Sequence, residues 1–296
     1  MSELFAPSEA TIRLAAFLAV FGGMALFELW SPRLERAEMA GAFKSRRWLT
    51  NLSLVILSSV MVRILFPAAA VGAALWAQAN GWGLFHLAGL DPVLAGIAAF
   101  IILDFAVWLE HVVSHKFLLL WRIHRMHHAD TGFDVTTGLR FHPLEIVLSM
   151  VWKAAVVVAI GAPVIAVLIF EIVLNATSMF NHSNARLPLG LDRVLRRIVV
   201  TPDMHRVHHS SIPSETDSNY GFNFPFWDHL FGTYNDQPRL GHDGMEIGLR
   251  DYRGDRTSGL LWALALPFRA VGRRATLAAR NSESTFPKHD TADRKD

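Results

Sequence analysis

Residues 92–115 read PVLAGIAAFIILDFAVWLEHVVSH, an apolar run that ends in a His-x-x-x-His pair. The apolar part, from Pro92 to about Leu109, is long enough to cross a hydrocarbon layer of roughly 30 Å as a helix. His111 and His115 follow one helical turn apart, so both imidazoles face the same side. This stretch predicts a membrane-spanning helix that brings two potential metal ligands to one face of the membrane.

Three further apolar stretches surround this one. They run from Thr11 to Trp30, from Trp48 to about Gln78 with an interruption at Arg63, and from Leu144 to Phe180. The last is interrupted at residues 161–163 (Gly-Ala-Pro), which indicates a helical hairpin whose arms are barely long enough to cross. The hydrophobic content of 52% lies above the range of soluble domains. We therefore predict an all-α integral membrane bundle of about four or five transmembrane helices with a histidine-rich helical cap.

The charges between the stretches predict the orientation of the bundle. The linker 31–47 contains five Lys and Arg residues, whereas the connection 79–91 contains none. The positive-inside rule then puts the first linker and every histidine cluster on the cytoplasmic side. The N-terminus has two glutamates and no basic residue ahead of the first stretch, so a cleaved signal peptide is not expected. We predict an integral protein of a bacterial inner membrane.

Composition excludes several classes of site. The chain has no cysteine, which rules out disulfides, thiolate metal sites and cysteine-ligated iron–sulfur clusters within it. The net charge of +2 comes mostly from Arg and Lys beside the apolar runs, so it indicates membrane orientation, and no nucleic-acid partner is expected. The fourteen histidines are the residues that stand out.

Two more histidine clusters accompany the first pair. They are HRMHH at residues 124–128 and HRVHH at residues 205–209. Histidines three and four apart share a helix face, so each cluster can aim its rings at one point. Imidazole suits iron, zinc, copper or nickel, and the lack of a Glu-x-x-His pair favours an all-nitrogen site. The eight candidate metal ligands, enough for two ions, are His111, His115, His124, His127, His128, His205, His208 and His209.

The isolated histidines have a simpler interpretation. A lone histidine is more often a helix-surface or core residue than a metal ligand, and this applies to His86, His229, His242 and His289. One His-x-x-x-His pair alone would also be weak evidence. The repetition of His-x-x-His-His, together with that pair at one membrane face, is what predicts a metal centre.

The three clusters together resemble those of the fatty acid hydroxylase/sterol desaturase superfamily of membrane di-iron enzymes. Five further pieces match: RFHPLE (140–145), NHSN (181–184), TPDMHRVHH (201–209), SNYG (218–221) and WDHLFGTY (227–234). The similarity covers roughly residues 95–234. The spacing between His115 and His124 looks like that of the alkylglycerol monooxygenase branch. The resemblance implies that the eight histidines bind two iron ions, with His182 as a ninth ligand or as a donor beside them.

The same resemblance implies an O2-dependent oxidoreductase that hydroxylates a C–H bond of a lipid. Fatty acyl, sterol-like, carotenoid and ether lipids are all open as substrates. Electrons would come from a separate electron-transfer protein or reductant, because no fused electron carrier is evident. The first pair has three intervening residues where acyl-chain desaturases have four, so the substrate branch stays open.

Two alternatives remain. A lipid desaturase would use the same site. A non-enzymatic membrane metal-binding or transport protein would need ionisable ligands near the bilayer midplane and usually repeated halves, whereas here the histidines lie at helix ends and no repeat is seen.

Several other residues are candidates to bind the metal or to hold its ligands. Histidine ligands need partners for their second ring nitrogen. Asp104 lies two helical turns before His111 and Asp203 two residues before His205, although Asp104 could equally line the helix bundle. The candidates of this kind are His142, His182, Asn181, Asp104 and Asp203.

Intramembrane charges and interfacial aromatics carry further expectations. Glu171 is a functional candidate because it lies within an apolar stretch, or it pairs with Lys153 or Arg63 for structural reasons. A set of aromatic side chains either lines the path of the substrate or, as is more common, anchors the protein at the headgroup level. This set is Trp121, Phe222, Phe224, Phe226 and Trp227.

The chain divides into four predicted parts. Residues 1–94 form N-terminal transmembrane helices, and residues 95–251 form the di-iron domain. Residues 252–279 form an interfacial amphipathic helix, and the polar residues 280–296 form a disordered tail.

Overall fold

The structure is a computed structural model that describes residues 8–35, 41–67 and 69–270. Within these residues there is no β-strand, only two isolated bridges, Pro32 to Ala185 and Ser210 to Ile247. The prediction of an all-α fold is therefore confirmed. The predicted tail at 280–296, the last part of the predicted interfacial helix and His289 lie outside the described residues.

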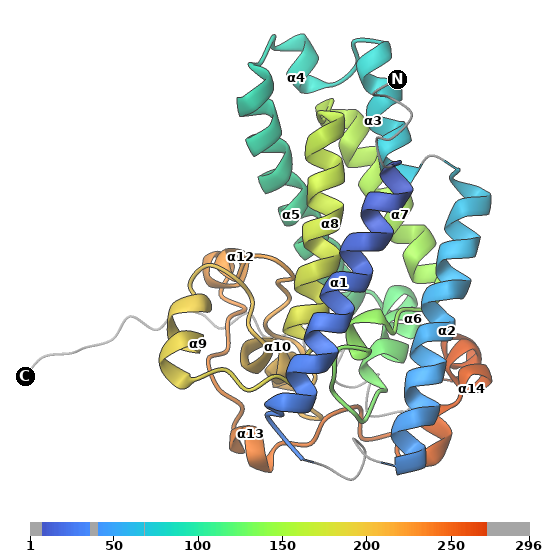
Figure 1. Cartoon of the computed structure of the whole chain (residues 1–296), viewed down its shortest axis with the longest axis vertical. Coiled ribbons are helices and arrows are strands. Elements are labelled where there is room, and N and C mark those ends of the chain that lie inside the picture. The colour runs from blue at the N-terminus through green and yellow to red at the C-terminus, as the bar shows by residue number, and fades with distance from the viewer. Residues whose placement is uncertain (1–7, 36–40, 68, 271–296) are drawn as a thin grey trace, which may run out of the picture.

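Five segments are long and apolar enough to cross a membrane, as the sequence predicts. They run side by side along the long axis of the molecule (Figure 1). Many apolar side chains on their outer faces are exposed, for example Leu26, Ile56 and Ile97, as expected of helices that contact lipid. The segments are α1 (Glu9–Trp30), α2 (Gly41–Leu65) continued by α3 (Ala69–Ala79), α5 (Pro92–Lys116), α7 (Pro143–Ile160) and α8 (Val164–Asn181).

The second apolar stretch, predicted from Trp48 to about Gln78 with an interruption at Arg63, is broken a few residues later, after Leu65. It is two helices, because α2 ends at Leu65 and α3 begins only at Ala69. Pro67 lies in the break, and proline has no amide hydrogen with which to continue a helix. Arg63 donates from Nη1 to the Pro67 carbonyl over 2.8 Å, so its charge lies at the carbonyl end of α2, where the helix dipole favours a cation.

The predicted hairpin between α7 and α8 is confirmed. Gly161 ends α7 with a left-handed backbone (φ 69°), and Pro163 directly precedes α8. A Cβ at position 161 would also lie 2.7 Å from the carbonyl oxygen of Trp82. Glycine is thus required at this turn by backbone conformation and by packing.

The core of the bundle lies between α3, α5, α7 and α8. Leu103, Val157 and Phe170 are among its buried side chains. Glu171 lies next to this core and accepts from Lys153 Nζ at 2.6 Å and from Arg13 Nη2 at 2.5 Å. The structure thus supports the expected pairing with Lys153 and replaces Arg63 by Arg13. Glu171 ties α8 to α7 and α1.

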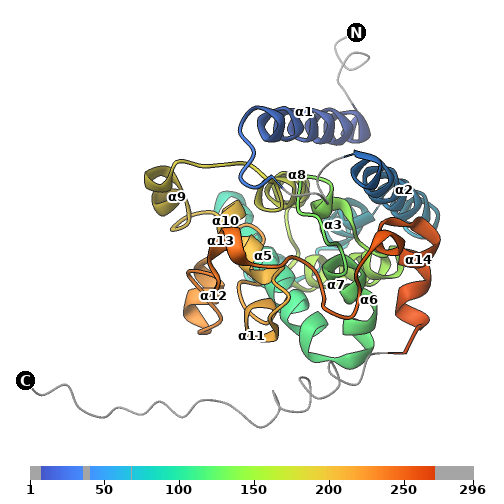
Figure 2. The ribbon, with the colours of Figure 1, turned by 90° about the horizontal axis from the view of Figure 1, so that it is seen from below.

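Short helices form a cap at one end of the bundle, opposite α4 (Leu84–Leu87) (Figure 1). All three histidine clusters belong to the cap end. Viewed from that end, α1 and α2 lie along one side of the molecule (Figure 2). The cap comprises α6 (Leu118–His128), η3 (Thr137–Leu139), α9 (Leu189–Leu195), α10 (Pro202–His208), α11 (Pro213–Thr216), α12 (Phe226–Leu230), α13 (Gly241–Gly244), η4 (Asp255–Ser258), α14 (Leu260–Ala265) and η5 (Leu266–Phe268).

The region predicted as one interfacial helix, 252–279, begins with shorter elements. Of its described residues, 260–268 form α14 and η5. Leu261 and Phe268 are exposed, whereas Ala263 and Leu266 pack against Leu54 of α2. The C-terminal region therefore packs onto the N-terminal helices with one face and presents apolar side chains outward with the other.

Candidate metal centre

The first pair and the second cluster are brought together by one tight reversal of the chain. His111 and His115 lie inside α5, which continues to Lys116, beyond the predicted end near Leu109. The amide of Phe117 closes α5 by donating to the Val113 carbonyl, and α6 begins at the next residue. The five residues of HRMHH are the last turns of α6, so they return alongside the end of α5.

The third cluster lies on α10, on the far side of the site. Pro202 occupies the first helical position, where its fixed backbone angle and missing amide are tolerated. His205 and His208 are within this short helix, and His209 is its C-terminal cap. The next loop returns to the site, because the carbonyls of Ser218 and Tyr220 both meet histidine rings.

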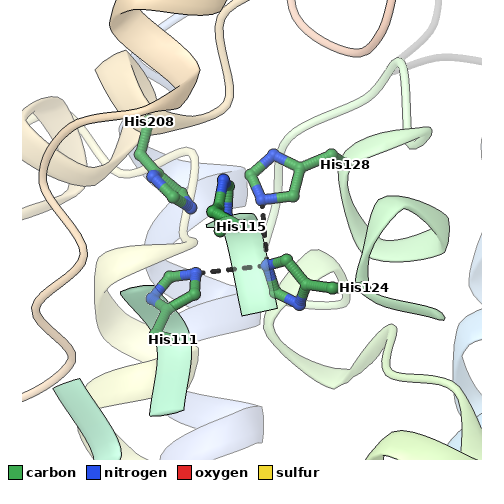
Figure 3. Close-up of side chains that lie close together, drawn as sticks. All are labelled: His111, His115, His124, His128 and His208. Atoms are coloured by element: carbon green, nitrogen blue, oxygen red, sulfur yellow. Dashed lines mark hydrogen bonds between the residues drawn. The ribbon is translucent and has the colours of Figure 1, made fainter. Parts of the chain in front are cut away.

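Nine histidines form two groups, with a candidate ligand nitrogen of each lying within 4.8 Å of the others in its group. Figure 3 shows the rings of the first group turned toward one another. All nine side chains are buried. We name them the first group, His111, His115, His124, His128 and His208, and the second group, His127, His182, His205 and His209.

The two groups lie directly beside each other. The rings of His128 and His209 stack with centroids 4.6 Å apart, and those of His205 and His208 are 5.0 Å apart. Each His-His dipeptide is divided between the groups. Consecutive residues on a helix point about 100° apart, so each His-x-x-His-His motif can serve two adjacent ions.

The outward-facing nitrogens of many of these rings are held by oxygen atoms that can only accept. A ring bonded to a carbonyl or carboxylate oxygen carries its proton on the bonded nitrogen, which leaves the other nitrogen as a bare lone pair. These bonds run from Nδ1 of His111 to Tyr220 O (2.7 Å), of His208 to Ser218 O (2.6 Å), of His182 to Ser178 O (2.8 Å), of His127 to Arg140 O (3.3 Å) and of His124 to Glu145 Oε1 (2.6 Å).

The inward-facing nitrogens therefore present lone pairs to one another. His111 Nε2 lies 3.2 Å from His124 Nε2, a contact drawn dashed in Figure 3. In the second group, His127 Nε2 lies 3.1 Å from His182 Nε2. Two lone pairs cannot form a hydrogen bond with each other, whereas a cation between them would turn both into ligands. Nε2 of His115 and of His208 are also buried without a hydrogen-bond partner. These residues fit two metal ions.

Burial favours the neutral form of five of the rings, the form that a metal ligand must have. Desolvation lowers the pKa of His182 from 6.5 to about 3. It also lowers the pKa of His127, His128, His205 and His209 well below the usual value, and the neighbouring histidines add to the effect in each case. Neutral imidazole nitrogens favour iron, zinc, copper or nickel over magnesium or calcium.

Comparison with known proteins agrees with this geometry. Residues 96–233 match the model of the fatty acid hydroxylase family. The part of the chain that contains the histidine clusters is therefore similar to the fatty acid hydroxylase family. The resemblance expected from the histidine motifs is thereby confirmed. Every one of the nine grouped histidines lies within the matched hydroxylase region.

The chain is also similar to individual hydroxylases. It is 29% identical to the ornithine lipid hydroxylase OlsE of Rhizobium tropici over 196 residues, 66% of this chain and 57% of that protein. It is 30% identical to the alkylglycerol monooxygenases of Danio rerio and Homo sapiens over 156 residues, 52% of this chain and 34% of theirs. The matches thus span little more than half of the first relative and a third of the others. No solved structure matches this chain.

Of the additional candidates predicted to bind the metal or hold its ligands, only His182 belongs to one of the two groups. His142 caps α7 by accepting from the Leu144 amide, and its other nitrogen meets the Leu264 carbonyl. Asp104 accepts from Trp227 Nε1 at 2.7 Å. Asp203 pairs with Arg33 and Arg206. Asn181 donates to the Phe222 carbonyl, and its Oδ1 is buried without a hydrogen-bond partner.

Sequence reasoning missed the residues that hold the ring nitrogens. Glu145 meets His124, and Asp217 Oδ1 lies 3.3 Å from His115 Nδ1. Glu145 ends the RFHPLE motif, and Ser218 and Tyr220 belong to SNYG. The motifs contained these residues, but which ring each one contacts depends on the fold.

The expected aromatic set is divided in the structure. Trp121 packs against His115 and His128, with ring centroids 5.0 and 5.6 Å apart, and Phe222 lies 5.0 Å from His111. Phe226 is exposed. Phe224 packs on Phe100 and Trp227 on Phe105, both residues of α5.

The isolated histidines lie apart from both groups where the structure describes them. His86 and His229 are exposed. His242 is buried, with Nε2 3.7 Å from Asp203 Oδ2.

Proposed function

We propose that this chain is a membrane-bound di-iron oxidoreductase that uses O2 to hydroxylate a C–H bond of a lipid. One observation carries the proposal: two adjacent groups of buried histidines with bare nitrogens facing inward lie at one end of a bundle of membrane-length helices. The similar proteins, an ornithine lipid hydroxylase and alkylglycerol monooxygenases, support a lipid substrate and oxygen chemistry.

The proposed ligands are the eight histidines of the three clusters and His182. Five rings would hold one iron and four the other, and the smaller set leaves coordination positions open. Iron bound there would supply the ability to use O2 against an unactivated C–H bond. The protein holds the rings in place, because Glu145 and the carbonyls of Ser178, Ser218 and Tyr220 fix their outer nitrogens. Partners of this kind orient metal ligands and raise their basicity.

Aromatic side chains would keep water from the centre. Phe141 stacks on His127 with centroids 4.5 Å apart, and Phe133 lies 5.2 Å from His209. Trp121 and Phe222 cover rings of the first group in the same way. A water-excluding wall suits oxidation of a C–H bond, because it protects the oxidant from side reactions.

A cavity beside the first group suits a hydrocarbon chain. It has a volume of about 220 Å³ between α5, α6 and α7, and most of its lining is apolar, including Leu109, Ile123 and Trp152. Glu145, the partner of His124, forms part of its wall. Leu148 and Trp152 at its edge are exposed on a membrane-length helix, so a lipid could reach it from the bilayer without entering water.

We further propose that the centre faces the cytoplasm of a bacterial inner membrane and receives electrons from a separate protein or reductant. The arrangement supports this orientation, because the described basic residues that follow α1, among them Arg33, Arg46 and Arg47, lie at the same end of the bundle as the elements that carry the three clusters (Figure 1). The positive-inside rule assigns such an end to the cytoplasm.

Lipid analysis of cells that express the chain tests the function. The intact protein should yield a lipid that gains one oxygen atom, and His208→Ala should abolish it. His229→Ala is the matched control, because this exposed histidine lies outside both groups, and it should keep the product. A lipid that instead loses two hydrogens would identify a desaturase. Bound metal with neither product, and no O2 consumed with any reductant, would indicate a metal-binding or transport protein.

A further inference from the structure

The second group is held by residues outside the region that matches the hydroxylase family. That region begins at residue 96, yet two segments next to the second group contact α1, α2 and the linker between them. These segments are residues 129–142, which follow His127 and His128, and residues 182–186, which begin at His182. Several side chains from the N-terminal part make the contacts, among them Glu28, Arg33 and Arg47.

Glu28 of α1 joins the two segments to each other. Its Oε1 accepts from the amide of Val135 at 2.7 Å and from the amide of Asn184 at 2.6 Å. The side chain is buried, so water does not compete for these amides. The Asn184 side chain also accepts from the Leu34 amide and donates to the Leu34 carbonyl. The end of α1 thus fixes the backbone two residues after His182.

Arg47 of α2 holds the loop after His127. It is fully buried, and its guanidinium meets Asp130 Oδ1 and Asp134 Oδ1 at 2.7 Å each. Its Nη2 also donates to Thr137 Oγ1 at 3.1 Å. A Cβ on Gly132 would lie 2.6 Å from the Arg47 Cζ atom, so the loop packs directly on the guanidinium. A buried charge with this many partners tolerates little displacement.

The loop passes this constraint to a histidine. The main-chain carbonyl of Arg140, in this loop, accepts a hydrogen bond from His127 Nδ1. The Arg140 side chain donates to Asn51 Oδ1 of α2 and to the Met126 carbonyl. His127 is therefore oriented by a carbonyl whose own position is fixed from α2.

Arg33, in the linker after α1, reaches α10. This helix carries His205 and is capped by His209, both of the second group, and it also carries His208 of the first group. Its Nε donates to Asp203 Oδ2 at 3.1 Å. Asp203 lies in the first turn of α10, two residues before His205. The main chain supports the contact, because the amide of Arg33 donates to Asn184 and the amide of Arg186 donates to Ser31.

The first group has its partners elsewhere. Glu145, Asp217, Ser218 and Tyr220 bond its ring nitrogens, and all four lie within residues 96–233. The N-terminal helices therefore contact the segments next to the second group. In the described part of the chain, they form no hydrogen bond with the residues that bond the ring nitrogens of the first group.

We propose that Glu28, Arg33 and Arg47 are positioning residues that set the affinity of the second group for its ion and leave the first group unchanged. This inference rests on the proposed two-metal centre. Partners behind metal ligands typically change affinity by about 10–100-fold, because they hold the ligand atoms in the geometry the ion requires.

Cobalt binding to the purified full-length protein tests the inference. The metal-free protein in detergent is titrated with Co²⁺ alone, in two backgrounds that keep one group each. His111→Ala with His115→Ala keeps the second group, and His182→Ala with His205→Ala keeps the first. Arg47→Lys should raise the Kd for Co²⁺ about 10–100-fold in the first background and leave it unchanged in the second.

A matched control and a milder variant separate positioning from general damage. Arg196→Lys is the control, because Arg196 also pairs with two aspartates, Asp192 and Asp236, away from the histidines. It should change neither affinity. Arg33→Gln removes a less buried contact and should weaken only the second group. Thermal unfolding of each metal-free variant verifies that the protein is folded.

Each result decides between two explanations. Equal weakening of both groups by Arg47→Lys and Arg33→Gln, or of neither, would overturn the positioning role. If the unsubstituted protein bound no Co²⁺ in either group, the proposed metal centre itself would be wrong.

Discussion

The first and second histidine groups lie side by side, yet they are supported in different ways. Carboxylates stand behind two rings of the first group, those of His124 and His115. In the second group the outer nitrogens of His127 and His182 meet main-chain carbonyls. A carboxylate partner raises the basicity of an imidazole, and so its strength as a metal ligand, more than a main-chain carbonyl partner does. Similar sequence motifs can therefore build two histidine groups that differ chemically.

The groups also differ in how far along the chain their supports lie. Tyr220 and Ser218 follow the third cluster closely, and Glu145 is 21 residues from His124. Arg47, by contrast, is 83 residues from Asp130, and Glu28 is 156 residues from Asn184. The second position therefore depends on correct assembly of the N-terminal helices, whereas the first is largely built by the family region itself.

Acid should have the largest effect, and it acts on both groups. The pKa of His182 is about 3 in the folded chain, and the pKa values of His205 and His209 in the second group and of His128 and His208 in the first are well below 6.5. The unfolded chain therefore binds protons that the folded chain excludes as pH falls below about 6.5. Metal-free protein should lose up to about 1.4 kcal/mol of stability per pH unit for His182 between about pH 6.5 and pH 3, and the other buried rings should add to this loss as pH falls below about 6.5.

Chemical unfolding of the metal-free protein across this range measures the slope. His182→Gln removes one such ring and should make the slope shallower by up to about 1.4 kcal/mol per pH unit. Stability that stayed flat between pH 7 and pH 4 would contradict the burial of neutral rings.

Gly138→Ala should remove the ion of the second group and leave the first. A Cβ at position 138 would lie 2.6 Å from the Ser178 carbonyl oxygen and 3.2 Å from His182 Nδ1. The methyl group must push η3 away from the end of α8, at a cost of about 1–3 kcal/mol. Metal counts per chain should fall from two to one.

Gly190→Ala is the control for this substitution, because nothing lies within 4 Å of a Cβ there. It should keep both ions. Retention of two tightly bound ions by Gly138→Ala would show that the close approach to His182 does not govern the second group.

Glu145→Gln should weaken the first group by about 10–100-fold and spare the second. The substitution keeps the shape of the side chain and removes the charge that meets His124 at 2.6 Å. Co²⁺ titration of variants that keep one group each gives the two affinities. Equal affinity of the substituted and unsubstituted first group would remove the chemical distinction between the groups.

Asp217→Asn should have the smallest effect. Asp217 is about one-third exposed and lies 3.3 Å from His115, while it also meets Lys116. Exposed pairs contribute about 0.2–1 kcal/mol, so the affinity of the first group should fall by a few-fold at most. The same titration measures it. If Asp217→Asn lowered the Co²⁺ affinity as much as Glu145→Gln, the greater exposure of Asp217 would not explain the relative importance of the two carboxylates.

Sequence patterns predicted the grouped histidines better than the residues that hold them. The repeated His-x-x-His-His motif has a spacing that a helix converts directly into a shared face, so its histidines could be named as candidate ligands without coordinates. His182 stands alone and was reached only through resemblance. The division of each His-His dipeptide between two groups was not predicted, because it depends on how α6 faces α10.

The supports could not be predicted because they act over long separations or through the main chain. Arg47 is one of five basic residues in a linker that the positive-inside rule explains equally well. The carbonyls of Ser218 and Tyr220 carry no side-chain signal at all. Pro67 did mark the break between α2 and α3, but the charge of Arg63 within the apolar run indicated an interruption earlier in the chain.

Iron content tests the central claim most directly. The purified chain, reconstituted with Fe²⁺ without oxygen and freed of loosely bound metal, should hold two iron ions. His111→Ala with His115→Ala, or His182→Ala with His205→Ala, should each reduce this number to one. A chain that retained no iron, or one readily exchanged ion that neither pair of substitutions removed, would contradict the account.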